Sequence, residues 1–371
     1  MKMSGASKQQ IGFTIVEMMV GLGLSSIITL GMMQLFVENT RTYHMLSGQS
    51  FMQESGRFAI KTLTRSGQMA GYKGCFSKNK EIYKTFLADI PYEFDIATSV
   101  RGFEAETTTW LPDIETVLPK TVSNVNSNIY AAGTAGPGNG IDTSKILRGT
   151  DIVTFNHIHE TKHRLAVDMA TSGEVVEVEN AGFEFGVDHM AFIHDCEKGT
   201  VFRVTGFDGT NKVEHDGTVD ADGYTNALTR LAEFNTFETD AFVSAIISET
   251  YFIMASQSEN QFGNKPMSLW RKIGIEAPQE IVNGIEDLQV RYGIDTDNDN
   301  IPNKYVDANE VADFGSVLTL RITVVANSVN DVDGGSSPTH GCGNQYCKPG
   351  ETTDGLLRRS FTRTVVLKNR G

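Results

Sequence analysis

The sequence has no charged residue from position 18 to position 37 and no proline before Pro91. An uncharged apolar run of about 20 residues is long enough to cross a bilayer as a helix, and an internal proline would break that helix. A secretory signal peptide would need a small-x-small cleavage site after the run, and Phe36-Val37-Glu38-Asn39-Thr40-Arg41 offers none. These absences favour a long N-terminal helix that stays in the membrane.

Catalytic motifs are also missing. The sequence contains no G-x-S-x-G nucleophile elbow, no P-loop and no nucleotide-binding fingerprint. His157, His159 and His163 cluster around Glu160, but their spacing does not match H-E-x-x-H, and a polar loop after a strand explains them better. We therefore expect a protein that is not an enzyme, and a membrane-anchored periplasmic enzyme is the least supported class.

Acidic residues outnumber basic ones, so the 371-residue chain has a formal net charge of −14. This balance argues against general binding to a phosphate backbone, so no nucleic-acid partner is predicted. Lys2 and Lys8 precede the apolar run and Glu38 follows it, which favours an N-terminus on the cytoplasmic side of the inner membrane. The rest of the chain would then face the periplasm.

Glu17 is the one acidic residue within positions 13–37. A lone carboxylate in a membrane segment is costly and needs a partner, so it is a functional hypothesis by default. It lies in the run Gly12-Phe13-Thr14-Ile15-Val16-Glu17, behind the short basic leader.

This run resembles the class III signal of type IV pilins and type II secretion pseudopilins. The resemblance implies that residues 1–12 are a leader peptide, which a prepilin peptidase removes after Gly12 before methylating the new amino terminus of Phe13. It also implies that Glu17 pairs with a neighbouring subunit's terminal amine in the filament. Residues 13–37 would form the transmembrane and filament-core helix.

The helix is expected to continue beyond the apolar run. Aromatic and aliphatic residues recur at helical spacing with charged residues between them, which predicts an amphipathic helix over residues 38–70. Gly71 and Gly74 mark its end. From Asp151 onward, short β-rich runs separated by turns predominate. The expected strands are residues 151–158, 174–179, 189–194, 200–205, 243–255, 267–273, 287–292, 316–326 and 360–367.

These elements predict an α+β fold, in which the long helix packs on a mostly antiparallel β-sheet. Residues 71–371 would form the periplasmic globular domain.

Two further motifs narrow the resemblance. The first is Glu54-Ser55-Gly56-Arg57-Phe58-Ala59, which is similar to the E-x-G-R-F-A motif of the PilW family of minor type IV pilins. The second is Ala70-Gly71-Tyr72-Lys73-Gly74-Cys75, which is similar to the A-G-Y-x-G-C motif of the same family. Other matching pieces are Asp151-Ile152-Val153, Asp195-Cys196, Val201-Phe202-Arg203-Val204, Leu269-Trp270-Arg271 and the run over residues 281–293. The stretch from about residue 80 to 150 is not covered.

The PilW resemblance implies a type IV pilin-like fold and a structural role. A minor pilin of this kind primes pilus assembly and is incorporated near the tip. Its expected partners are other minor pilins, the major pilin, a tip adhesin, the inner-membrane assembly platform and the prepilin peptidase. Twitching motility, adhesion and DNA uptake are the processes such pili serve. A J-like pseudopilin of type II secretion, at the tip of a pseudopilus, is the alternative.

The chain has four cysteines, Cys75, Cys196, Cys342 and Cys347. An even number in a periplasmic domain suggests disulfides, and four cysteines allow three pairings. The Gly/Asn-rich loop between Cys342 and Cys347 could close on itself, which leaves Cys75 to pair with Cys196. A metal site that uses His340 fits no structural zinc spacing, and free thiols are the other alternative.

Asp295, Asp297 and Asp299 alternate as they do at the start of an EF-hand-type calcium loop. Asn300 stands where that loop has glycine, and Val306 stands where it has the bidentate glutamate. The alternative is an Asx-rich turn in which these side chains bond their own backbone. Calcium at this loop is thus a prediction with a structural alternative.

Overall fold

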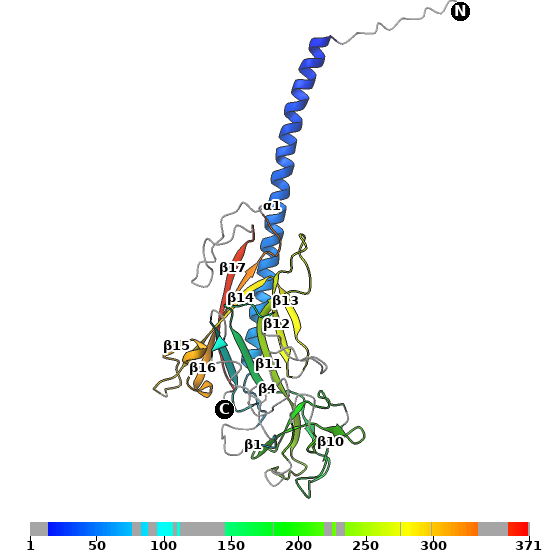
Figure 1. Cartoon of the computed structure of the whole chain (residues 1–371), viewed down its shortest axis with the longest axis vertical. Coiled ribbons are helices and arrows are strands. Elements are labelled where there is room, and N and C mark those ends of the chain that lie inside the picture. Colours follow the sequence, from blue (N-terminus) through cyan, green and yellow to red (C-terminus); the bar gives the residue numbers. More distant parts are fainter. Residues whose placement is uncertain are drawn as a thin grey trace, which may run out of the picture.

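A long helix and several β-sheets make up the part of the chain that the computed structural model describes. These are residues 14–75, 83–87, 95–106, 110–111, 145–180, 182–218, 225–227, 234–274, 276–297, 299–332 and 355–369. The helix projects from one end of the molecule, and the sheets gather around its second half (Figure 1).

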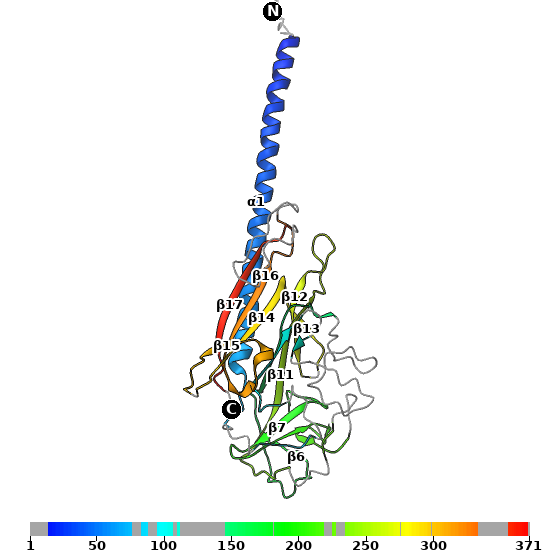
Figure 2. The same ribbon diagram turned by 60° about the vertical axis from the view of Figure 1, so that its left-hand side comes forward.

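Helix α1 (Ile15–Met69) is 55 residues long and continuous, or about 82 Å at the usual rise per residue. Its first half stands clear of the rest of the described chain, and its second half lies against the sheets (Figures 1 and 2). The buried residues of α1 all belong to the second half: Gly48, Met52, Ser55, Gly56, Ala59, Leu63, Ser66 and Gly67. One helix therefore has a free half and a packed half, as the sequence predicts.

The sheet that packs on α1 has four antiparallel strands in the order β15-β14-β16-β17. Its apolar face and the buried face of α1 share one core. The strands are β14 (Ile285–Ile294), β15 (Lys304–Val306), β16 (Val317–Asn327) and β17 (Arg358–Val366), and the 3-10 helices η5 (Ala308–Glu310) and η6 (Phe314–Ser316) lie between β15 and β16.

A ten-stranded sheet occupies the other side of this core. Its central strand is the 14-residue β11 (Phe242–Ala255), which pairs with β4 and β12 near α1 and with β7 and β5 farther away. The other strands are β1 (Tyr83–Thr85), β2 (Val100–Ala105), β3 (Trp110–Leu111), β4 (Ile152–Ile158), β5 (His163–Arg164), β7 (Met190–His194), β8 (Gly199–Arg203), β12 (Met267–Ile273) and β13 (Gln279–Asn283). Among the described residues, every strand pair of this sheet is antiparallel except β1 with β8.

The end of the molecule farthest from the free half of α1 forms a lobe, which we call the distal lobe (described residues of 163–240). It contains β7 and β8 and a small sheet of β6 (Val176–Glu177), β10 (Lys212–Glu214) and β9 (Gly206–Phe207). Its core is rich in aromatic side chains, including Phe185, Phe202 and Phe234. The same core includes apolar residues of β11, so continuous burial joins the lobe to the central strand.

The predicted α+β fold, with a long helix on a mostly antiparallel sheet, is confirmed. Each expected strand overlaps an observed one, although residues 174–179 contain only the two-residue β6. Strand β2 was not predicted. Its Gly102 weakens the strand pattern, but the position requires glycine, since an ideal Cβ there would lie 1.7 Å from the Tyr292 hydroxyl oxygen.

Candidate functional site

The first turn of α1 holds Glu17 in a capping box. The Glu17 carboxylate accepts hydrogen bonds from the Thr14 backbone N–H at 3.0 Å and from the Thr14 hydroxyl at 2.9 Å. The Glu17 N–H in turn donates to the Thr14 hydroxyl oxygen at 3.3 Å. The T-x-x-E signature of this cap is present in the sequence and was missed there. Gly12 and Phe13 lie outside the described residues.

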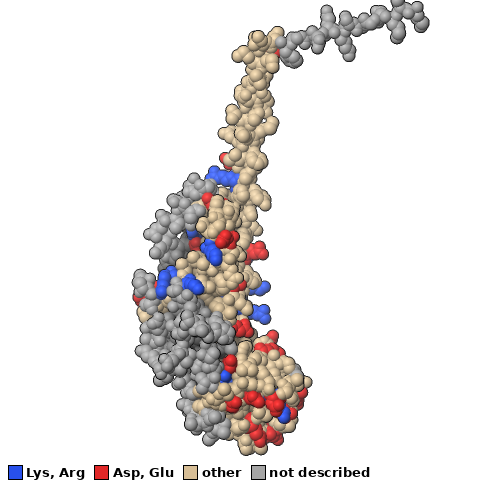
Figure 3. Space-filling view, turned by 45° about the vertical axis from the view of Figure 1, so that its right-hand side comes forward, with Lys and Arg blue, Asp and Glu red and all other residues tan. Residues whose placement is uncertain are grey.

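The free half of α1 presents an apolar surface on every side. All fifteen large apolar residues from Ile15 to Val37 are exposed, from 56% for Val20 to 80% for Ile15. It is the one described helix long and apolar enough to cross a membrane, and Figure 3 shows no blue or red side chain over most of it. Burying fifteen such side chains is worth on the order of 20 to 40 kcal/mol, so lipid or other helices must cover this surface.

The E-x-G-R-F-A motif lies where α1 seats on β17. An ideal Cβ on Gly56 would come within 2.2 Å of the Phe361 ring, and Ala59 is fully buried beside it. Arg57 and Phe58 of the same motif point away from the sheet and are exposed. The small residues of this motif therefore allow the helix to approach the strand closely. Arg57 and Phe58 remain accessible to a partner.

A groove runs between this exposed side of α1 and the sheet edge at β13. It has a volume of about 630 Å³, and its apolar walls come from Phe51, Phe58, Ile281 and Val282. Glu280 lies in the same wall and accepts hydrogen bonds from the hydroxyls of two serines at 2.6 and 2.7 Å. The groove extends the exposed surface of α1 into the packed half of the helix.

The A-G-Y-x-G-C motif fastens the end of α1 to strand β4. The Gly71 N–H donates to the Asn156 carbonyl at 2.7 Å, and the Ile158 N–H donates to the Tyr72 carbonyl at 2.9 Å. Gly71 and Gly74 have φ angles of +77° and +70°, which glycine adopts without strain. The motif thus turns the chain sharply and delivers Cys75 to the distal lobe.

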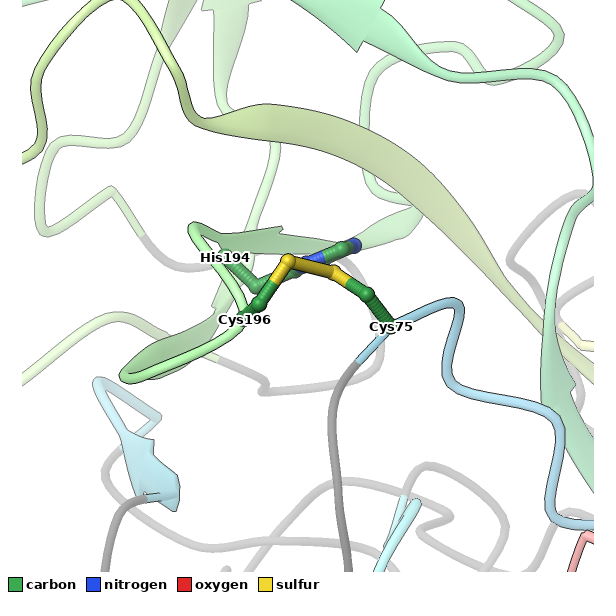
Figure 4. Close-up of side chains that lie close together, drawn as sticks. All are labelled: Cys75, His194 and Cys196. Carbon is green, nitrogen blue, oxygen red and sulfur yellow. A yellow bond between two sulfur atoms is a disulfide. The ribbon is translucent and has the colours of Figure 1, made fainter.

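Cys75 and Cys196 form a disulfide, the pairing that the sequence analysis favoured for these two residues (Figure 4). Cys196 follows β7 in the turn toward β8, so the bond joins the end of α1 to the distal lobe. His194 lies beside it, with Nδ1 3.7 Å from the Cys75 sulfur, and burial lowers the pKa of this histidine to about 4. Cys342 and Cys347, the other predicted pair, lie outside the described residues.

The predicted calcium loop brings its three aspartates together. One carboxylate oxygen from each of Asp295, Asp297 and Asp299 lies within 4.8 Å of the others. The loop is also an Asx turn, because Asp295 accepts from the N–H groups of Asp297 at 3.2 Å and Asn300 at 2.7 Å. Three hard oxygen ligands fit Ca²⁺, but about 6–8 are usual, so calcium here stays a prediction.

The histidine cluster does not converge. His157 contacts the neighbouring Ile158 carbonyl at 3.0 Å, and the His159 ring accepts from the Thr161 N–H at 3.1 Å. His163 is paired with Glu184 at 2.8 Å. Only His159 lies in the predicted polar loop, because His157 belongs to β4 and His163 to β5. The three rings serve separate contacts.

Two acidic residues that sequence reasoning missed, the buried Asp151 and the half-buried Glu104, lie where the two large sheets meet. Asp151 is 2% exposed, and its carboxylate accepts from the N–H of Ala105 at the end of β2 at 3.0 Å and of Val290 in β14 at 2.8 Å. Burial raises the pKa of Asp151 well above its usual value, and burial with the charge of Asp307 raises that of Glu104 to about 7. No local pattern signals this pair, because 139 positions separate Asp151 from Val290.

The distal lobe is strongly acidic. Its described residues include thirteen Asp and Glu and only four Lys and Arg. Each basic side chain is within 4 Å of an acidic one: Arg164–Glu179, Lys198–Asp195, Arg203–Asp188 and Lys212–Glu177. Figure 3 shows acidic side chains gathered on this end of the molecule. A surface of this kind repels other polyanions.

A long N-terminal helix, apolar and exposed at first and then packed on antiparallel sheet, gives the protein a type IV pilin-like architecture. The family model PilW, described as Type IV Pilus-assembly protein W, matches residues 250–369. This segment runs from within β11 through β17 and is about a third of the chain. The predicted resemblance to PilW is confirmed there and links the protein to type IV pilus assembly. A search of curated proteins gave no match.

Proposed function

We propose that the protein is a minor type IV pilin, processed after Gly12, that primes pilus assembly and enters the filament near its tip. The observation that carries this proposal is the single helix α1, which is apolar and exposed in one half and seated on the PilW-matched sheet in the other. Such a helix can hold the subunit in the inner membrane before assembly and pack against other helices in the filament afterwards. Its role is structural rather than enzymatic.

The partners follow from this role. Prepilin peptidase acts on the leader, and the inner-membrane platform, other minor pilins, the major pilin and a tip adhesin meet the subunit during assembly. In the membrane the chain spans once, with its globular part in the periplasm. The groove beside Phe51 and Phe58 adjoins the helix surface that packs in the filament.

The charge at Glu17 sets the register of the helices in this proposal. In the single chain its carboxylate caps α1 through Thr14. In the filament it would pair with the methylated terminal amine of a neighbouring subunit, because an unpaired charge among apolar helices is disfavoured.

A deletion scored in two assays tests the function. Loss of major pilin sheared from the surface, with normal secretion of folded enzymes, is expected. Loss of secretion with normal surface pilin would instead identify a J-like pseudopilin. Gly12→Asp should block removal of the leader, and a variant that still loses about 1.3 kDa, the mass of 12 residues, would contradict peptidase processing.

Two substitutions separate the charge of Glu17 from its capping role. Glutamine can keep the capping box but has no charge, whereas alanine loses both. We expect Glu17→Gln and Glu17→Ala to be inserted and processed yet depleted from sheared pili, with Glu38→Ala as the matched acidic control. Normal incorporation of Glu17→Gln would refute the charge pair.

A further inference from the structure

Strand β17 is the longest described strand at a sheet edge. It has nine residues and pairs with β16 in an uninterrupted register from Arg358 to Val366. The edge strands β1, β3, β6, β9 and β15 have two or three residues each, and the β12–β13 pairing contains a bulge. Short length and bulges are devices that protect edges from pairing with other chains. β17 has neither.

The hydrogen-bond alternation shows which backbone groups reach the open edge. The Leu367 N–H donates to the Leu318 carbonyl, and the Ser328 N–H donates to the Leu357 carbonyl. In an antiparallel ladder alternate residues bond the same neighbour, so the odd-numbered residues of β17 face β16. The N–H and C=O groups of Thr362, Thr364 and Val366 therefore point outward. No strand in the described part of the chain pairs with this edge.

Four of the six residues from 361 to 366 in β17 are accessible. Thr362, Arg363 and Thr364 are exposed, and Val366 is 55% exposed. Helix α1 packs on the face of this sheet, where Gly56 meets the Phe361 ring. A partner strand could approach the outward groups in the plane of the sheet.

The charge around this edge is opposite to that of the whole chain. Residues 355–369 contain Arg358, Arg359, Arg363 and Lys368 and no acidic residue, whereas the chain has a net charge of −14. Arg358 is paired with Glu286, and the Arg359 guanidinium lies over the Phe361 ring, 5.6 Å from its centroid. No described carboxylate is within ion-pair distance of Arg359 or Arg363. Those two side chains share one face of the strand, four residues apart.

We propose that residues 361–366 of β17 accept an added β-strand from a partner protein, and that this strand carries acidic side chains opposite Arg359 and Arg363. Main-chain hydrogen bonds would supply affinity and the arginines would supply specificity. A second copy of β17 is a poor occupant, since two such strands would bring six arginines together. This inference does not depend on the pilin role.

A peptide titration of the full chain in detergent micelles tests the proposal. The probe is a capped seven-residue peptide of alternating threonines with glutamates at positions 2 and 6 and valine at position 4. Its control has lysines in place of the glutamates. We expect saturable binding at roughly millimolar concentration and no binding of the lysine peptide. Amide exchange should slow at Thr362 and Thr364, which lie opposite the peptide when its glutamates face Arg359 and Arg363.

Proline at one position isolates the strand addition. Thr364→Pro removes an outward N–H and leaves the hydrogen bonds to β16 intact, which edge strands tolerate. Thr364→Pro should weaken the affinity for the glutamate peptide at least tenfold. Thr364→Ala keeps the N–H and should bind this peptide as the wild type does. Arg363→Glu should reduce binding of the glutamate peptide and admit the lysine peptide. The unfolding midpoint of each variant serves as the control for folding.

Three results would overturn the proposal. The first is equal binding by Thr364→Pro, at an unchanged unfolding midpoint, and the second is the absence of amide protection at saturating peptide. The third is a concentration-dependent dimer that Thr364→Pro abolishes, because a second copy would then be the occupant instead of an acidic strand.

Discussion

Alanine at Gly56 should weaken the seat of helix α1 on strand β17. The ideal Cβ position lies 2.2, 2.4 and 2.8 Å from three carbons of the Phe361 ring, so the ring or the helix must move. Overpacking of this kind costs about 1–3 kcal/mol. The intrinsic helix preference of alanine over glycine returns roughly 1 kcal/mol. We therefore expect Gly56→Ala to lower the free energy of unfolding by up to about 2 kcal/mol.

The same helix supplies graded controls. At Gly67 the Cβ would meet Val365 at 3.1 Å, and at Gly21 it would meet nothing within 4 Å. The expected order of stability is Gly21→Ala at or above wild type, then Gly67→Ala, then Gly56→Ala. Tryptophan fluorescence during denaturant unfolding of the full chain in micelles measures this order, because Trp110 and Trp270 are both buried.

A second substitution identifies the ring as the cause. Phe361→Leu opens space above Gly56, so the cost of Gly56→Ala should shrink by at least half when both substitutions are combined, a coupling that a double-mutant cycle detects. If Gly56→Ala proved as stable as Gly67→Ala, or equally costly with and without the Phe361 ring, the close-approach explanation of the E-x-G-R-F-A motif would be wrong.

Three other predictions concern pH, calcium and the disulfide. Since the pKa of Glu104 is raised to about 7, the folded chain keeps a proton that the unfolded chain releases near pH 4.5. The free energy of unfolding should therefore fall by about 1–2 kcal/mol, after solvent screening, as the pH rises from about 4.5 to 7. In Glu104→Gln the free energy of unfolding should depend less steeply on pH, and an equally steep dependence would contradict this prediction. Calorimetric titration should detect calcium at the aspartate loop and lose it in Asp297→Asn, and no heat at millimolar calcium would end that idea. Cys75→Ser should lower the unfolding free energy by about 3–5 kcal/mol, since the bond closes a separation of 121 residues, and an unchanged denaturant midpoint would contradict this.

Much of the fold follows from local sequence patterns. The uncharged run and the amphipathic stretch after it predict both halves of α1, and β-rich runs bounded by turns predict β11 and β16. The predictions succeed there because each element carries its own period of apolar residues, which local propensity and burial both favour.

The features that sequence reasoning missed depend on distant neighbours. Gly102 is required in β2 by the hydroxyl of Tyr292, and Asp151 is buried because β14 lies over it. Neither neighbour is near in sequence, so no window around these residues reveals the contact. The Thr14–Glu17 cap is different, because its signature was local and a functional interpretation of Glu17 obscured it.

The Cys75–Cys196 bond also has a mechanical consequence. In the filament proposed above, tension would act on this protein through α1, and the chain leaves α1 shortly before Cys75. Load that reaches Cys75 can pass through the sulfur atoms directly into the turn after β7. The 121-residue separation between the cysteines, a contour of roughly 400 Å when extended, is thereby taken out of the load path. The disulfide lets the distal lobe bear force without being drawn out as a tether.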